Sequence, residues 1–108
     1  EQSVNARNKE HLKWLRSYEA VVEANVSHAR QKADELAQEI AWREQNRLDS
    51  EAAGYRFKPE EQRSFRAEVR RLQQVKLDCH RVVEAGEEHL TKLRGTFGLA
   101  GTLQEEGS

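Results

Sequence analysis

Apolar side chains recur along the first half of the chain at steps of three and four residues, the spacing that places them on one face of an α-helix. The stretch 3–53 contains neither Pro nor Gly. Ten of its positions follow steps of 3, 4 and 4: Leu15, Tyr18, Val22, Val26, Ala29, Ala33, Ala37, Ile40, Glu44 and Leu48. Nine of the ten are apolar, and the exception is Glu44. This eleven-residue repeat, about 3.67 residues per turn, predicts one long helix over residues 3–53. Gly54 stands where a left-handed residue would end it.

A second helix is predicted over residues 59–94. Pro59 suits the first helical position, and the acidic residues after it complement the positive end of the helix dipole. Its inward positions alternate by four and three: Phe65, Val69, Leu72, Lys76, Cys79, Val83, Gly86, Leu90, Leu93 and Phe97. Arg94 followed by Gly95 indicates the C-terminal end of the helix.

The five residues 54–58 are a suitable length for a turn between antiparallel helices. Facing positions would then pair as Leu48 with Phe65, Ile40 with Leu72, Ala33 with Cys79, Val26 with Gly86 and Val22 with Leu90. The predicted fold is therefore all-α, a long, coiled-coil-like antiparallel helical hairpin over residues 1–94. Residues 95–108 are expected to form a Gly-containing tail or linker.

The two predicted helices differ in length, so part of the first one would lack a partner. Phe97, Leu99 and Leu103 in the tail could cover this part by packing near Trp14 and Leu15. The alternative architecture is a three-helix bundle, formed if the first helix breaks near residues 25–27 or if the tail docks.

Composition limits the function classes. The 108 residues (12.5 kDa) carry 18 Lys and Arg against 19 Asp and Glu, so the net charge of −1 gives no general attraction to nucleic acid. No apolar run is long enough to cross a membrane. The single cysteine excludes an internal disulfide and favours a reducing, intracellular and cytoplasmic location. Because the chain begins with Glu1, we expect a piece of a longer protein.

The sequence does not predict an enzyme, a cofactor or a metal site. The glycines at 95, 98 and 101 do not have the dinucleotide-binding spacing, and they follow a predicted helix rather than a strand. A helical hairpin also lacks a concave site from which water is excluded. His80 and Glu84 are one helical turn apart, but no third ligand lies nearby. Cys79 is expected to be a small core residue.

Two surfaces are candidates for partner binding. Arg63, Arg66, Arg70 and Arg81 fall within about 60° of one another on the second helix, away from its apolar face. Such a row of arginines suits an acidic partner. The alternative is that these arginines only form a solvent-exposed face of the helix and bind nothing. Trp42 lies almost opposite the apolar stripe of the first helix. It is either an interaction residue or is covered by another segment of the chain.

These features predict a non-catalytic protein–protein interaction or assembly module, such as a coiled-coil adaptor or scaffold piece. One version is a homodimer formed through Trp42, Val21 and Ala24. The other is binding of a different protein with an acidic surface to the arginine row. Nucleic acid is a less favoured partner, because the basic positions are not interleaved with aromatic residues.

The outline of residues 30–94 resembles the antiparallel coiled-coil finger domains of Rho-GTPase effectors. Those domains carry a Gly-Ala-Glu-Asn-like segment late in their first helix, where this chain has Glu51-Ala52-Ala53-Gly54. Their first helix is also shorter, so no site residue is transferred. The resemblance implies a small-GTPase effector as the alternative function. Preference for a GTP-bound over a GDP-bound partner would distinguish it from an adaptor.

Overall fold

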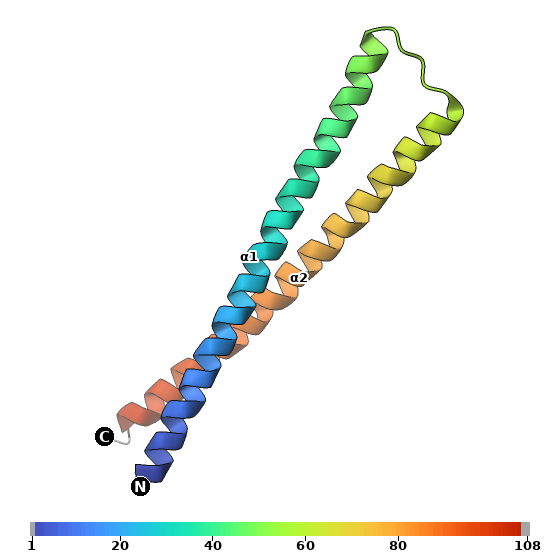
Figure 1. Cartoon of the computed structure of the whole chain (residues 1–108). Coiled ribbons are helices and arrows are strands. Elements are labelled where there is room, and N and C mark those ends of the chain that lie inside the picture. The colour runs from blue at the N-terminus through green and yellow to red at the C-terminus, as the bar shows by residue number, and fades with distance from the viewer. Residues whose placement is uncertain (1, 107–108) are drawn as a thin grey trace. The chain divides into compact units, whose positions relative to one another are not determined.

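The fold is a pair of long helices joined by a short loop (Figure 1). The computed structural model describes the backbone of residues 2–106 and the side chains of residues 7–96. Helix α1 spans Gln2–Ala52, helix α2 spans Pro59–Glu106, and the described residues include no strand. The predicted all-α helical hairpin is confirmed. Helix α1 is continuous, so the alternative with a break near residues 25–27 is wrong.

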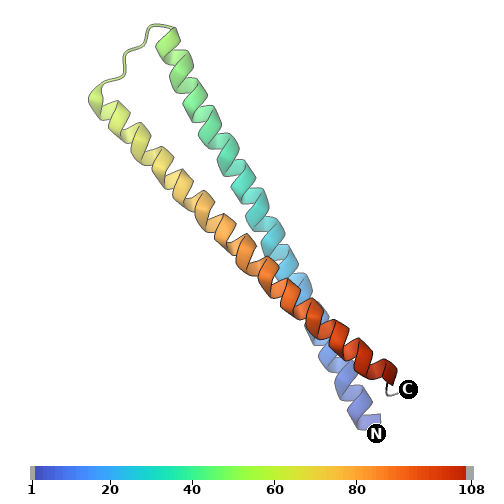
Figure 2. The same ribbon diagram turned by 180° about the vertical axis from the view of Figure 1, so that it is seen from behind.

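The chain divides into two compact units, each containing a stretch of both helices (Figures 1 and 2). The loop unit comprises residues 29–82, with the loop between α1 and α2. The terminal unit comprises residues 1–28 and 83–108. Each unit has its own apolar core, and each is described separately.

The core of the loop unit is formed by Leu36, Ile40, Val69 and Leu72, which are buried between α1 and α2. Phe65, Val75 and Cys79 pack against this cluster. Cys79 is thus the small core residue expected from its position. Burying an aliphatic side chain of this size stabilises a fold by about 1.5–3 kcal/mol, so these contacts hold the two helices together.

The core of the terminal unit contains Val22, Val26 and Leu90, with Val83 packed against them. Gly86 faces Val26 so closely that a Cβ on Gly86 would overlap the Val26 side chain. The predicted facing of Val22 with Leu90 and of Val26 with Gly86 is consistent with these contacts.

The inward face of α1 differs from the predicted eleven-residue repeat. Leu36 is buried where Ala37 was expected to be, and beyond Ile40 the half-buried positions of α1 are Arg43, Arg47 and Ser50. Glu44 and Leu48 are instead exposed. The inward positions of α2 repeat every 3.5 residues on average. The inward face of α1 stays in contact with that of α2 along their length only if it has the same repeat. The prediction failed because two arginines occupy inward positions.

Helix α2 extends to Glu106, beyond the predicted end at Arg94. Among the described glycines, Gly54 has a positive φ and Gly95 does not, so Gly95 continues the helix instead of capping it. A glycine lowers helix stability by about 1 kcal/mol relative to alanine, but it does not force the helix to end. The predicted packing of Phe97, Leu99 and Leu103 falls on side chains outside the described residues.

Candidate protein-interaction surface

The candidate site is an open groove in the loop unit, beside the exposed side chain of Trp42. Trp42 is 64% exposed, so no described segment of the chain covers it. The groove has a volume of about 240 Å³ and is lined by residues from α1, α2 and the loop: Trp42, Arg43, Asn46, Arg47, Ser50, Phe57 and Phe65. Three aromatic rings therefore border one apolar hollow.

The groove lies at the end of the loop unit where the helices are furthest apart. In both ribbon views the α1 and α2 stretches of this unit diverge toward the loop (Figures 1 and 2). Large side chains occupy this end, including Phe65 and Phe57, whereas Ala33 and Cys79 lie nearer the other end. Larger side chains thus lie where the two helices of this unit are further apart, and smaller ones lie where they are closer.

The N-terminal side of the loop is fixed by the C-terminal cap of α1. Gly54 has a φ of +96°, in the left-handed region that favours glycine. The Gly54 N–H donates to the Glu51 carbonyl (3.0 Å), and the Tyr55 N–H donates to the Ser50 carbonyl (2.9 Å). This pair of bonds is the Schellman motif, which ends the helix and turns the chain. The predicted role of Gly54 is confirmed.

Glu61 fixes the other side of the loop. Its carboxylate accepts a hydrogen bond from the Tyr55 hydroxyl (2.7 Å) and a longer one from the Lys58 backbone N–H (3.5 Å). The second bond is half of a capping box at the start of α2. Donation to Glu61 raises the pKa of Tyr55 above its usual value of 10.0, because the bond holds the phenol proton.

The same loop positions the aromatic ring of Phe57. The rings of Tyr55 and Phe57 meet edge to face with their centroids 4.7 Å apart. The side-chain amide of Gln62 donates to the Phe57 carbonyl (3.3 Å). Phe57 is therefore held from two sides, and one wall of the groove depends on the conformation of the loop.

Arg47 contributes a cation to the groove. Its guanidinium carbon lies 5.0 Å from the centroid of the Phe65 ring, a cation–π geometry. Its Nε atom is buried and has no hydrogen-bond partner. Within the described part of the chain Arg47 forms no ion pair, so none of the described carboxylates balances its charge.

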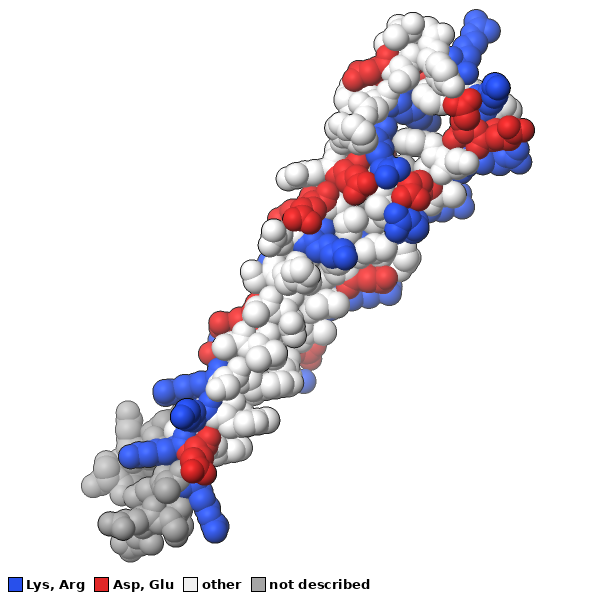
Figure 3. All heavy atoms as spheres, viewed as in Figure 1, with Lys and Arg blue, Asp and Glu red and all other residues white. Residues whose placement is uncertain are grey.

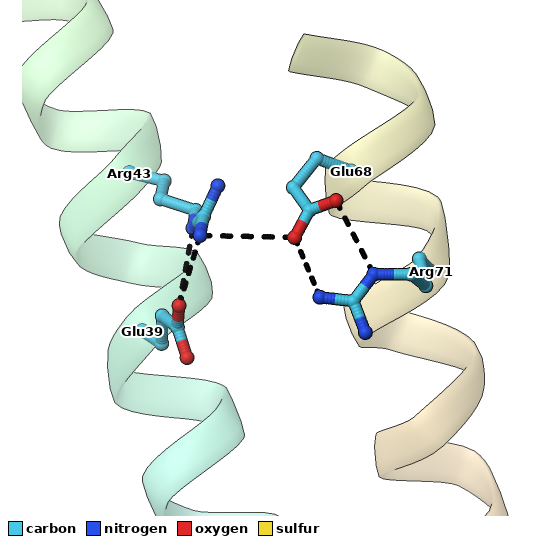
Figure 4. Close-up of polar contacts among 4 residues, drawn as sticks. All are labelled: Glu39, Arg43, Glu68 and Arg71. Atoms are coloured by element: carbon cyan, nitrogen blue, oxygen red, sulfur yellow. Dashed lines mark hydrogen bonds and ion pairs between the residues drawn. The ribbon is translucent and has the colours of Figure 1, made fainter. Parts of the chain in front are cut away.

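Arg43, the other cation of the groove, belongs to a chain of ionic contacts across the helices (Figure 4). Its Nη2 lies 3.0 Å from Glu39 Oε1 on α1 and 3.7 Å from Glu68 Oε1 on α2. Arg71 holds Glu68 through two hydrogen bonds of 2.6 and 3.2 Å. These bonds lower the pKa of Glu68 and raise that of Arg71, because each charge stabilises the other. The charge of Arg43 is therefore already balanced.

The predicted arginine row is exposed but does not join the groove. Arg63, Arg66 and Arg70 are exposed, and within the described residues they form no ion pair. Arg81 lies 3.8 Å from Asp78 in an exposed pair. None of these four lines the groove. On the face that Figure 3 shows, Lys and Arg alternate with Asp and Glu around the loop end.

The terminal unit carries a separate set of exposed rings. Trp14 is 60% exposed and stacks on Tyr18 at a centroid distance of 5.6 Å, and Tyr18 meets the edge of His89. Val21 and Ala24 are exposed in the same unit. Arg94 pairs with Glu23 (2.8 Å) across the helices. Tyr18, predicted to face inward, thus lies at the edge of this core.

Two further observations concern other kinds of site. In the described part of the chain, no group of three or more His, Cys, Asp or Glu side chains is placed to hold a metal ion. The described helices include none with enough consecutive apolar residues to span a bilayer.

The sequence identified Trp42 but missed the other walls of its groove. The predicted repeat follows apolar side chains and so does not include Arg43 and Arg47, although the long aliphatic part of an arginine can cover apolar surface. Phe57 was missed because it falls in the loop. The signal that could have found it is the placement of two aromatic residues, Tyr55 and Phe57, within a loop of a few residues.

Comparisons of this chain with protein-family models, with curated proteins and with solved structures give no match.

Proposed function

We propose that this chain is a non-catalytic protein-interaction module, an adaptor or assembly piece whose contact surface is the groove beside Trp42. The observation that carries the proposal is the 64% exposure of Trp42 next to the rings of Phe57 and Phe65. Tryptophan is enriched among the residues that contribute most to binding energy, and an exposed apolar hollow is energetically costly in water. A partner that covers the groove would remove that cost.

The arginine row supports the same function as a second contact surface for an acidic partner protein. Arg66 lies three residues after Arg63 and four before Arg70, a spacing at which like charges destabilise a helix. Elsewhere in the same unit, Arg71 is paired with a carboxylate. An acidic partner would relieve the repulsion within the row.

A retention experiment tests the proposal. The immobilised chain is incubated with an extract of the cells that make it, in three forms: unchanged, Trp42→Ala and Trp14→Ala. Trp14 is the matched control because it has a similar exposure but lies in the other unit. We expect a protein that is retained in stoichiometric amount by the unchanged chain and by Trp14→Ala, and lost with Trp42→Ala.

The solution mass, measured over a tenfold concentration range, tests whether the partner is a second copy of this chain. A mass near twice 12.5 kDa that Trp42→Ala returns to that of the monomer supports self-assembly through the groove. A monomer at every concentration, together with identical retention by all three forms, contradicts the proposed function.

A further inference from the structure

The groove beside Trp42 is unbalanced in charge. Two guanidinium groups line it, and its lining includes no carboxylate. Arg43 is neutralised by Glu39 and Glu68, which lie 3.0 and 3.7 Å away. Among the described residues, Arg47 has no carboxylate partner, and none accepts a hydrogen bond from its buried Nε atom. The Arg47 guanidinium is therefore a cation without a described carboxylate partner that lines the groove beside Trp42.

We propose that the groove binds an acidic segment of another protein, which inserts one bulky apolar side chain and places an adjacent Asp or Glu carboxylate on Arg47. The apolar side chain contacts Trp42, Phe57 and Phe65, and the carboxylate accepts from the Arg47 guanidinium. This inference rests on the proposed function and specifies the chemistry of the partner.

A carboxylate is the acceptor that the position of Arg47 favours. The Arg47 guanidinium carries a charge that no carboxylate of the described residues pairs with, and hydrogen bonds between ionised groups are the strongest ones that side chains make. Phe65 holds the guanidinium plane through the cation–π contact at 5.0 Å. Because the guanidinium is already positioned, a carboxylate would bind it with little loss of side-chain freedom.

The size of the groove indicates a side chain rather than a whole small molecule. Its volume of about 240 Å³ is open to solvent and lies below the range of about 300–1,000 Å³ that small-molecule sites occupy. The polar lining residues Asn46 and Ser50 can hydrogen-bond to a peptide backbone at the rim. An apolar anchor on a peptide fits these dimensions.

The surroundings disfavour a nucleic acid in the same place. Glu39 and Glu68 lie next to Arg43, and acidic side chains are interspersed with basic ones around this end of the unit (Figure 3). A phosphate backbone needs a continuous run of cations, whereas Arg47 offers one. A single carboxylate matches that single charge.

Peptide titration followed by NMR tests the inference. The probe is the acetylated, amidated peptide Gly-Glu-Phe-Glu-Gly, added to the ¹⁵N-labelled full chain. The two tryptophans, Trp14 and Trp42, give two indole N–H signals. We expect the Trp42 signal to move in a saturable way while the Trp14 signal stays in place. Replacing both Glu residues of the peptide by Gln, or its Phe by Ala, should weaken binding about tenfold each.

Variants of Arg47 test its role. Arg47→Gln removes the charge, and Arg47→Lys keeps the charge but removes the planar guanidinium that can bind a carboxylate through two donors. We expect both to weaken binding of the acidic peptide, by about tenfold for Arg47→Gln. Lys32→Gln, an exposed cation of α1 in the same unit, is the control and should leave binding unchanged. Unaltered circular dichroism shows that each variant folds.

Several results would overturn the inference. These are equal binding of the Glu and Gln peptides, movement of both indole signals together, or tighter binding of a thymidine oligonucleotide with a steep dependence on salt. Absence of peptide binding also overturns it. If Trp42→Ala nevertheless abolishes retention of a partner or dimerisation, the proposed function stands without this partner chemistry.

Discussion

Gly86 on α2 lies directly against the side chain of Val26 on α1, with no room for a Cβ between them. The contact fixes the register of the helices in the terminal unit, because a shift of either helix along its axis would bring a larger residue to this point. Glycine is required here by the close approach of the two helices and not by a turn.

Gly86→Ala should destabilise the fold, although alanine favours a helix by about 1 kcal/mol over glycine. The new methyl group meets the Val26 side chain, and valine in a helix has one strongly preferred rotamer, so it cannot easily move aside. Overpacking of this kind costs about 1–3 kcal/mol. In a Val26→Ala background the same change should become stabilising. Urea unfolding of the four chains of this double-mutant cycle measures the reversal; a Gly86→Ala effect of the same sign in both backgrounds contradicts the contact.

Gly54→Ala should destabilise the fold by about 1–2 kcal/mol, because a residue with a Cβ is strained at the φ of +96° that the C-terminal cap of α1 requires. Gly95→Ala is the matched control. Gly95 is helical, and nothing lies within 4 Å of the position of its added Cβ. Alanine there should stabilise the helix by about 0.5–1 kcal/mol. Thermal unfolding of the two variants should therefore show opposite shifts in Tm.

Glu61→Ala should destabilise the fold by about 1 kcal/mol, since both the Tyr55 hydroxyl and the Lys58 N–H lose their acceptor. Glu60→Ala removes a neighbouring charge from the same helical turn without breaking either bond, so it should cost less. Chemical denaturation gives the difference. Equal losses for the two variants would show that Glu61 acts only through the helix dipole.

The stability contributed by Glu68 should depend on pH. The hydrogen bonds from Arg71 lower its pKa below the usual value of 4.5. A lowered pKa in the folded state gives a contribution that is complete above 4.5 and is lost as the pH falls through the folded-state pKa. Urea unfolding of the unchanged chain and of Glu68→Gln, from about pH 7 to about pH 2, should show a difference that disappears in acid. Glu84→Gln serves as the control; a Glu68→Gln effect that does not vary with pH contradicts this account.

The sequence predicted the fold because the determining features are local. The apolar spacing, Gly54 and Pro59 each specify a helix or its end through the residues in their immediate vicinity. The predicted end of α2 at Arg94 is wrong, because Gly95 does not adopt the left-handed conformation that a helix cap needs.

The groove could be predicted only in part. Trp42 could be identified because it lies almost opposite the apolar face of the first helix, where the sequence shows no other segment that would cover it. Its neighbours come from elements brought together by the loop and by the 3.5-residue repeat. A repeat of 3.5 residues per turn places Arg47 on the inward face of α1, over Phe65, whereas a repeat of 3.67 places Leu48 there. The sequence does not distinguish the two repeats in this part of α1.

If the proposed function holds, the groove beside Trp42 is open in the free chain and covered in the complex. Acrylamide quenching of Trp42 fluorescence in a Trp14→Phe chain tests it most directly, because Trp42 is then the sole tryptophan. We expect strong quenching in the dilute chain, and protection with a blue-shifted emission when the retained partner is added to saturation. A Trp42 that is already shielded in the free monomer, or equally quenched in the complex, would contradict it.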